Sequence, residues 1–142
     1  MKRDYTGRPG KIVAVGLNYK DHAAEFNLPL PTEPIIFLKP ATSAILNGER
    51  IIYPCGATRV DYEAELGVVI GRTARRVSAE DARDFIEGFT CVNDVTERHM
   101  QGRDGQWTRA KSFDTFCHIG PAVTDEIDPG RVGVRCFLNG EL

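Results

Sequence analysis

The stretch 61-DYEAELGVVIG-71 is the most strand-like segment of the chain, and it begins acidic and ends apolar. Glu63 and Glu65 lie two residues apart in it, so an extended strand projects both carboxylates from one face, directly beside the apolar run 66–70. Two like charges side by side repel each other. The pattern therefore predicts that something positive lies between Glu63 and Glu65.

A third carboxylate ends a segment of similar character. Asp94 closes 89-FTCVND-94, which also reads as a strand. Hard divalent cations such as magnesium prefer oxygen ligands at about 2.1 Å, and three carboxylates leave open positions for water or a chelating ligand. Glu63, Glu65 and Asp94 are thus candidate ligands of one divalent ion. The alternative is that Asp61, Glu63 and Glu65 line a solvent-facing strand edge.

The rest of the chain alternates short apolar runs with polar connections. Further strands are expected at 11–16, 35–40, 89–96, 117–123 and 131–138, with a shorter one within 47–56. A short helix is expected behind Asp21, and another over 79–88 behind Ser78, because both residues are good N-caps. The stretch 97–114 reads as a long polar loop of the kind that builds functional sites.

The end of the chain carries the strongest two-residue hairpin signal, Asn139-Gly140. Leu142 follows two residues later, before any returning strand. We therefore expect the front part of a longer fold, with an exposed sheet edge unless another chain covers it.

Composition favours one soluble domain over residues 1–142. The chain is 42% hydrophobic and has a formal charge of −2, so it offers no field for nucleic acid or an acidic membrane surface. It shows no signal peptide and no membrane-spanning run, which predicts a cytoplasmic protein. The four cysteines form no C-x-x-C pair, and we expect buried thiols rather than zinc ligands or disulfides.

Two further pairs of side chains are candidates for chemistry. His22 and Glu25 share one helix face and could activate water, although an ordinary exposed face has the same pattern. Lys39 and Lys111 adjoin apolar residues, so their ammonium groups could stabilise an enolate or oxyanion; the alternative is two surface lysines. His99 and His118 have no partner at useful spacing.

Five ordered motifs resemble the fumarylacetoacetate hydrolase family, in particular its acylpyruvate hydrolase and diene-dioate isomerase branch. They are GLNYKDHAAEF, IIFLKP, DYEAELGVVIG, FTCVNDVTERHMQ and QWTRAKSFD. The resemblance implies an α+β, mostly β fold with a rolled mixed β-sheet, incomplete in this chain. It also implies a homodimer, completed by strands and a Gly-Thr-Pro loop that are absent here.

The resemblance implies roles for the candidate residues. Glu63, Glu65 and Asp94 match metal ligands for Mg²⁺ or Mn²⁺, and His22 and Glu25 match a catalytic dyad on a lid helix. The other matching residues face the substrate. Lys111 matches a catalytic residue, and the positions of Gln101, Arg98 and Lys39 match residues that bind the substrate.

The implied reaction takes place on a small 2-oxo acid through a metal-bound enolate. Hydrolysis of a carbon–carbon bond in an acylpyruvate or fumarylacetoacetate-like substrate is the favoured interpretation. Isomerisation of 2-hydroxyhepta-2,4-diene-1,7-dioate and decarboxylation of oxaloacetate stay open, because all three pass through the same enolate. Leu17 stands where some acylpyruvate hydrolases carry arginine, which leaves the substrate open. A metal-binding fragment without activity and a domain without metal are the rival hypotheses.

Overall fold

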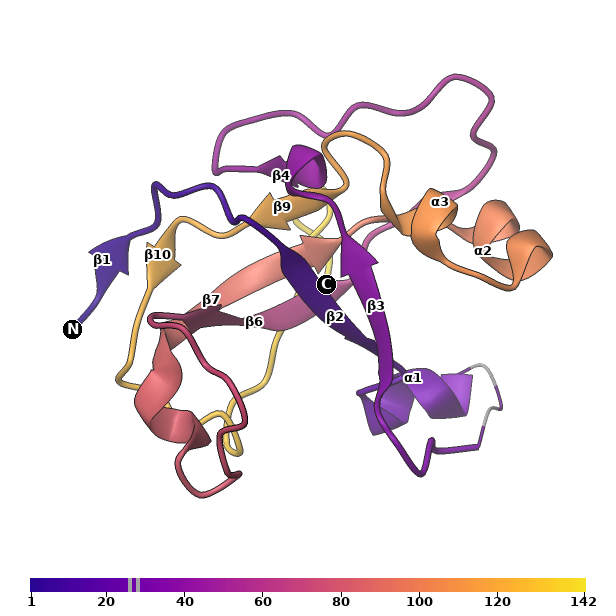
Figure 1. Cartoon of the computed structure of the whole chain (residues 1–142). Helices are drawn as coiled ribbons and strands as arrows, with labels where there is room; N and C mark the ends of the chain where they lie inside the picture. The colour runs from indigo at the N-terminus through magenta and orange to yellow at the C-terminus, as the bar shows by residue number, and fades with distance from the viewer. Residues whose placement is uncertain (26, 28) are drawn as a thin grey trace.

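A mixed four-stranded β-sheet forms the centre of the protein (Figure 1). The computed structural model describes residues 1–25, 27 and 29–142, apart from the side chains at positions 21, 22 and 25. The strands of the sheet lie in the order β4-β9-β7-β6, with bounds β4 Ala44–Ile45, β9 Cys117–Ile119, β7 Ile86–Asp94 and β6 Ala64–Ile70. The β4–β9 pair is parallel and the others are antiparallel.

The long pair β6–β7 sets the register of the sheet. Ala64 pairs with Asn93 at one end and Ile70 with Ile86 at the other. β-branched residues such as Val68, Val69 and Thr90 suit this pairing because they pack on a pleated surface. The buried core lies along β4 and β9, where Ala44, Cys117 and Ile119 form one cluster, against which Tyr5, Ile12 and Val92 pack.

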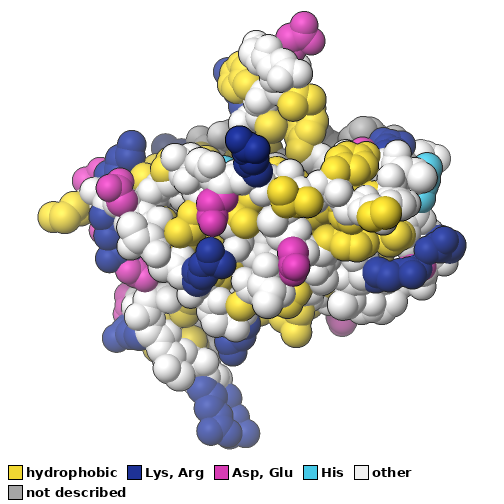
Figure 2. All heavy atoms as spheres, turned by 90° about the horizontal axis from the view of Figure 1, so that it is seen from above, with side chains coloured by type: hydrophobic (Ala, Val, Ile, Leu, Met, Phe, Trp, Pro, Cys, Tyr) yellow, Lys and Arg dark blue, Asp and Glu magenta, His cyan; other side chains and the backbone are white. Residues whose placement is uncertain are grey.

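A two-stranded ribbon, β2 (Ile12–Gly16) and β3 (Ile35–Lys39), crosses in front of the sheet in Figure 1. Its inner face carries Phe37 and Lys39, which are both buried. Its outer face consists of Val13, Val15, Ile36 and Leu38, which are all exposed. Hydrophobic side chains also reach the surface among the charged groups in Figure 2. The ribbon therefore covers the sheet with one face and leaves an aliphatic face outside.

Short elements frame the sheet. The pairs are β1 (Arg3–Asp4) with β10 (Ala122–Val123), and β5 (Val60–Asp61) with β8 (Thr96–Glu97). The α-helices are α1 (Lys20–Glu25), α2 (Arg98–Asp104) and α3 (Thr108–Lys111), and the 3-10 helices are η1 (Ala41–Ser43) and η2 (Ala82–Phe85). Figure 1 shows α2 and α3 together at one end of the molecule. Among the described residues, no helix is long and apolar enough to cross a membrane.

The expected mixed, mostly β fold is confirmed, as are strands within 11–16, 35–40, 61–71, 89–96 and 117–123. The short strand expected within 47–56 is wrong. The loop expected at 97–114 is also wrong, because α2 and α3 occupy most of it.

The helix expected over 79–88 is replaced by the single turn η2. The Ser78 hydroxyl does accept a hydrogen bond from the Asp81 amide at 3.2 Å, but it caps no helix, because η2 begins only at Ala82 and its N-cap residue Asp81 makes no side-chain cap bond. The sheet then takes over, because the Gly71 amide donates to the Phe85 carbonyl and Ile86 pairs with Ile70. Tertiary pairing thus overrides a local helix signal.

The expected strand at 131–138 is absent too, and no described strand lies alongside it. The turn that follows is as expected. Asn139 and Gly140 both have positive φ, and Leu138 and Glu141 exchange two backbone hydrogen bonds across them. The four cysteines are free, but only Cys117 is buried: Cys136 is half-buried and Cys55 and Cys91 are exposed, so the prediction of buried thiols is confirmed for Cys117 alone.

Two glycine substitutions test how tightly β7 packs. A Cβ on Gly88 would lie 2.6 Å from Val123 Cγ1 and 2.8 Å from the Thr124 carbonyl oxygen. We expect Gly88→Ala to lower the free energy of unfolding by about 1–3 kcal/mol in a urea titration, because the backbone must move. Gly102→Ala in α2 is the matched control: nothing lies within 4 Å of its added Cβ, so it should be neutral or stabilising by up to about 1 kcal/mol. Equal effects of the two variants would contradict this account.

Candidate metal centre

Three carboxylates meet at one end of the β6–β7 pair. One oxygen from each of Glu63, Glu65 and Asp94 lies within 4.8 Å of the other two. Glu65 lies in β6 and Asp94 ends β7, whereas Glu63 lies in the irregular link before β6. Two hydrogen bonds fix that link: the Glu63 amide donates to Asn93 Oδ1 at 3.0 Å, and the Asp94 amide donates to the Glu63 carbonyl at 2.9 Å. The residues predicted as metal ligands are therefore brought together.

Two buried lysines reach into these carboxylates. Lys111 Nζ, from the end of α3, donates to Glu63 Oε2 at 2.7 Å and to Asp94 Oδ2 at 2.6 Å. Lys39 Nζ, from the end of β3, donates to Asp94 Oδ1 and, at 3.2 Å, to the Val95 carbonyl. Each lysine is only 2% exposed, so the alternative of surface lysines does not apply. Burial lowers the pKa of Lys39, although the Asp94 carboxylate opposes that shift.

Arg98 links the cluster to α2. Its guanidinium pairs with Asp61 Oδ2 at 2.9 Å and with Glu63 Oε1 at 2.5 Å, and its Nη1 donates to Gln101 Oε1 at 2.7 Å. The prediction that Arg98 and Gln101 bind the substrate is untested by these contacts. They do place both residues at the edge of the carboxylate cluster.

The two glutamates have opposite electrostatics. Burial alone would raise the pKa of Glu63, but the positive charges of Lys111 and Arg98 outweigh burial and hold it below its ordinary value. For Glu65, burial and the neighbouring charges of Asp94 and Glu63 raise the pKa to about 7. In the described part of the chain, no side chain makes a hydrogen bond or ion pair with the Glu65 carboxylate. Glu65 is the carboxylate with an unmet need for positive charge.

The donor set fits a hard divalent cation. Three carboxylate oxygens this close together are ligands that Mg²⁺ and Mn²⁺ prefer, and the ion would give Glu65 a directly bound cation, which no described side chain supplies. Phe37 and Trp107 pack edge to face with ring centroids 5.5 Å apart, and Lys111 Nζ lies 5.2 Å from the centre of the Phe37 ring. The Phe37 and Trp107 rings make the surroundings of the carboxylate cluster less polar. In less polar surroundings, the electrostatic interactions between its charged side chains are stronger.

The predicted dyad of His22 and Glu25 cannot be compared with the structure. The backbone of both residues lies in α1, but their side chains fall outside the described part.

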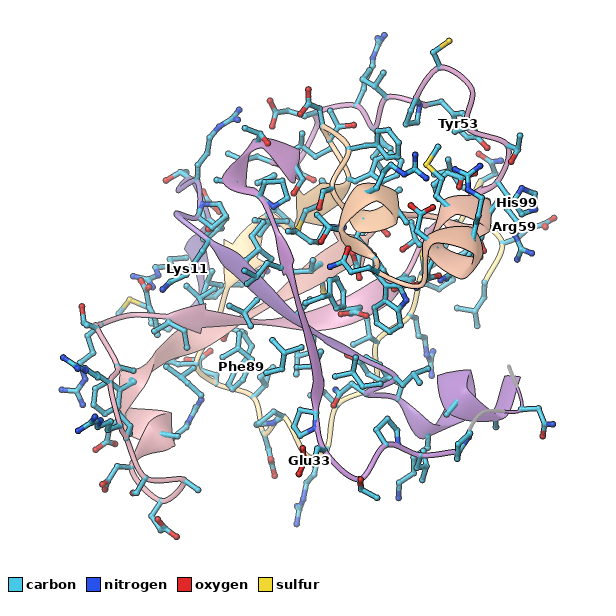
Figure 3. All side chains as sticks on the ribbon, turned by 45° about the vertical axis from the view of Figure 1, so that its right-hand side comes forward. Lys11, Glu33, Tyr53, Arg59, Phe89 and His99 are labelled. Atoms are coloured by element: carbon cyan, nitrogen blue, oxygen red, sulfur yellow. The ribbon has the colours of Figure 1, made fainter. Side chains whose placement is uncertain are left out.

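His99 contacts Thr58, and Figure 3 shows it with Arg59 and Tyr53 at one edge of the molecule. His118 is half-buried in β9.

Glu97 is an important residue that the sequence analysis missed. It is buried and N-caps α2, because its carboxylate accepts a hydrogen bond from the Met100 amide at 2.5 Å. The same carboxylate also accepts from the amides of Thr58 and Arg59. Burial would raise the pKa of Glu97, but these hydrogen bonds lower it. Glu97 thus fixes the start of the helix that presents Arg98. An acidic residue before a helical stretch was the available signal.

The chain matches a family model described as Fumarylacetoacetate (FAA) hydrolase C-terminal over residues 11–142. A 2,4-didehydro-3-deoxy-L-rhamnonate hydrolase of Sphingomonas sp. is 48% identical over 137 residues, which are 92% of this chain and 47% of that protein. A mitochondrial oxaloacetate tautomerase of Bos taurus is 46% identical over 140 residues, 95% of this chain and 45% of the relative.

Solved structures agree with the sequence matches. The crystal structure of 2-hydroxyhepta-2,4-diene-1,7-dioate isomerase from Mycobacterium marinum superposes with a TM-score of 0.76 at 44% identity, over 86% of this chain and 44% of that one. The chain spans about half the length of the curated relatives that it matches.

Removing the Glu65 charge should stabilise the metal-free protein. Between pH 4.5 and about 7 the unfolded chain ionises Glu65 while the folded chain keeps it protonated, so this carboxyl costs stability increasingly as pH rises through that window. We expect Glu65→Gln, with chelator present, to raise the free energy of unfolding at pH 8 by about 1–3 kcal/mol, and the gain to vanish below about pH 4.5.

Urea titrations at several pH values measure this gain. The control is Glu33→Gln, at an exposed position before β3 that Figure 3 labels. A gain at pH 8 that is equally large in both variants, or a loss in Glu65→Gln, would contradict the electrostatic description of the cluster.

Proposed function

The chain belongs to the fumarylacetoacetate hydrolase family, and we propose that its Glu63, Glu65 and Asp94 hold one Mg²⁺ or Mn²⁺ ion beside which a small 2-oxo acid reacts. One observation carries the proposal: carboxylate oxygens of Glu63, Glu65 and Asp94 lie within 4.8 Å of one another, and no described side chain bonds to the Glu65 carboxylate. The names of the relatives support the substrate class, since oxaloacetate is itself a 2-oxo acid.

A bound divalent ion would supply Lewis acidity, which polarises the carbonyl of the substrate and offsets developing negative charge. The two lysines supply further positive charge in the same buried place. Both ammoniums lie beside Asp94, so positive charge is already present where an enolate or oxyanion forms. We assign Lys111 to the stabilisation of that charge and Lys39 to the binding of the substrate carboxylate.

Arg98 and Gln101 are assigned to substrate orientation. The hydrogen bond from Arg98 engages Gln101 Oε1, so the amide is held with its NH₂ group as the side that donates to a ligand. We assign to His22 and Glu25, on α1, the activation of the water that attacks a carbonyl and breaks a carbon–carbon bond.

The favoured reaction is hydrolysis of an acylpyruvate or a similar 2-oxo acid. Keto–enol tautomerisation or isomerisation is a second candidate, favoured by the names of the tautomerase and isomerase among the similar proteins. Both need the same stabilised enolate, and they differ in whether water or a proton is delivered. Dimerisation and a cytoplasmic location stay predictions.

Turnover and metal binding together test the proposal. We expect the protein with Mg²⁺ or Mn²⁺ to consume an acylpyruvate or enol-oxaloacetate, followed as loss of enol absorbance. Glu65→Ala should lose metal-dependent thermal stabilisation and at least about a hundred-fold of the turnover, because a ligand is removed. Glu33→Gln should retain both.

The outcomes separate the rival hypotheses. Metal-dependent stabilisation that Glu65→Ala abolishes, with no turnover of either substrate, would favour a metal-binding unit without activity. If calorimetry shows that the protein binds neither Mg²⁺ nor Mn²⁺, the whole proposal is wrong.

A further inference from the structure

Lys111 occupies the space between two of the proposed metal ligands. Its ammonium lies 2.7 Å from Glu63 Oε2 and 2.6 Å from Asp94 Oδ2, so it bridges the link before β6 and the end of β7. A divalent ion bound to the same two oxygens has to lie between them at about 2.1 Å from each. The ammonium and the ion therefore compete for one position.

Lys39 is bound to the same aspartate in a different way. Its ammonium contacts Asp94 Oδ1, on the other side of the carboxylate, and is anchored to the Val95 carbonyl at 3.2 Å. Lys39 thus leaves Oδ2 to Lys111 or to a metal ion. It also keeps Oδ1 engaged, which favours Oδ2 as the Asp94 oxygen that an ion uses.

We propose that Lys111 is an exchangeable counter-ion: it pairs with Glu63 and Asp94 in the ion-free protein and withdraws from both when a divalent ion binds, while Lys39 stays on Asp94 Oδ1. The inference rests on the proposed function, since it takes the three carboxylates as a metal centre. It adds that the ion-free site is held together by this chain's own cation, and that Asp94 binds through Oδ2 alone.

The charges and surroundings support the exchange. The Lys111 ammonium carries a single charge and bonds Glu63 and Asp94 but not Glu65, whereas a divalent ion reaches all three carboxylates. The displaced ammonium keeps a partner, because the face of the Phe37 ring lies 5.2 Å from Nζ. Before the ion arrives, the Lys111 ammonium keeps the carboxylates of Glu63 and Asp94 close together. It also lowers the apparent affinity of the site for the ion, because its two bonds must be broken before the ion can bind.

Calorimetric titration with Mg²⁺ and Mn²⁺ tests the competition in the full chain. We expect Lys111→Met to bind each ion about tenfold more tightly than the wild type. Lys39→Met is the matched control, because it removes an equally buried ammonium from the same aspartate but from the oxygen that the ion does not use. Its affinity should rise clearly less than that of Lys111→Met.

A crystal structure of the wild-type protein with Mn²⁺ tests the geometry and needs no variant to fold. Lys111 Nζ should lie beyond about 3.5 Å from Glu63 Oε2 and Asp94 Oδ2, with Lys39 still on Asp94 Oδ1. Retention of both Lys111 bonds in the presence of the ion would overturn the exchange, as would equal gains in affinity in the two lysine variants. If the wild type binds neither ion, the metal centre itself is wrong and the exchange falls with it.

Discussion

Asp94 holds a buried ammonium on each of its two carboxylate oxygens, and the arrangement of the site depends on this contact. Charges buried this deeply must be paired, because an isolated one costs several kcal/mol. The pairing fastens β3 and α3 to the end of β7. It therefore determines where the β2–β3 ribbon crosses the sheet and where the helical end of the molecule lies (Figure 1).

Most strands were predictable because their signal is local. Short β-branched runs at 11–16, 35–40 and 61–71 form strands almost where the pattern puts them. Two of the failures share a cause: the pattern cannot say what lies alongside. Alternation at 131–138 defines a face, but no described strand pairs with it. Ser78 bonds the Asp81 amide as a helix cap would, yet only the short 3-10 helix η2 follows before β7 begins at Ile86.

The carboxylates of the site were predictable, and their neighbours only in part. Two acidic residues on either side of Ala64 signal a need for positive charge, and the sequence names Lys39 and Lys111 as candidates for other reasons. Their contact with Asp94 depends on pairings between distant segments, so no spacing rule could reveal it. Glu97 was predictable only in part: its place before a helical stretch was a local signal for the cap, but its bonds to residues 58 and 59 exist only after β5 and β8 have paired.

The contacts of the cluster also bear on how the chain folds. Lys39 and Asp94 are 55 positions apart, Lys111 and Glu63 are 48 apart, and β4 meets β9 through Ala44 and Cys117. Loops of this length must close before their contacts repay the lost entropy, so chains rich in distant pairings fold slowly. The geometry of the cluster accordingly exists only once these distant pairings have formed. A ligand that contacts all of these side chains at once therefore binds only to folded molecules, in which the β2–β3 ribbon and α3 already pack against the central sheet.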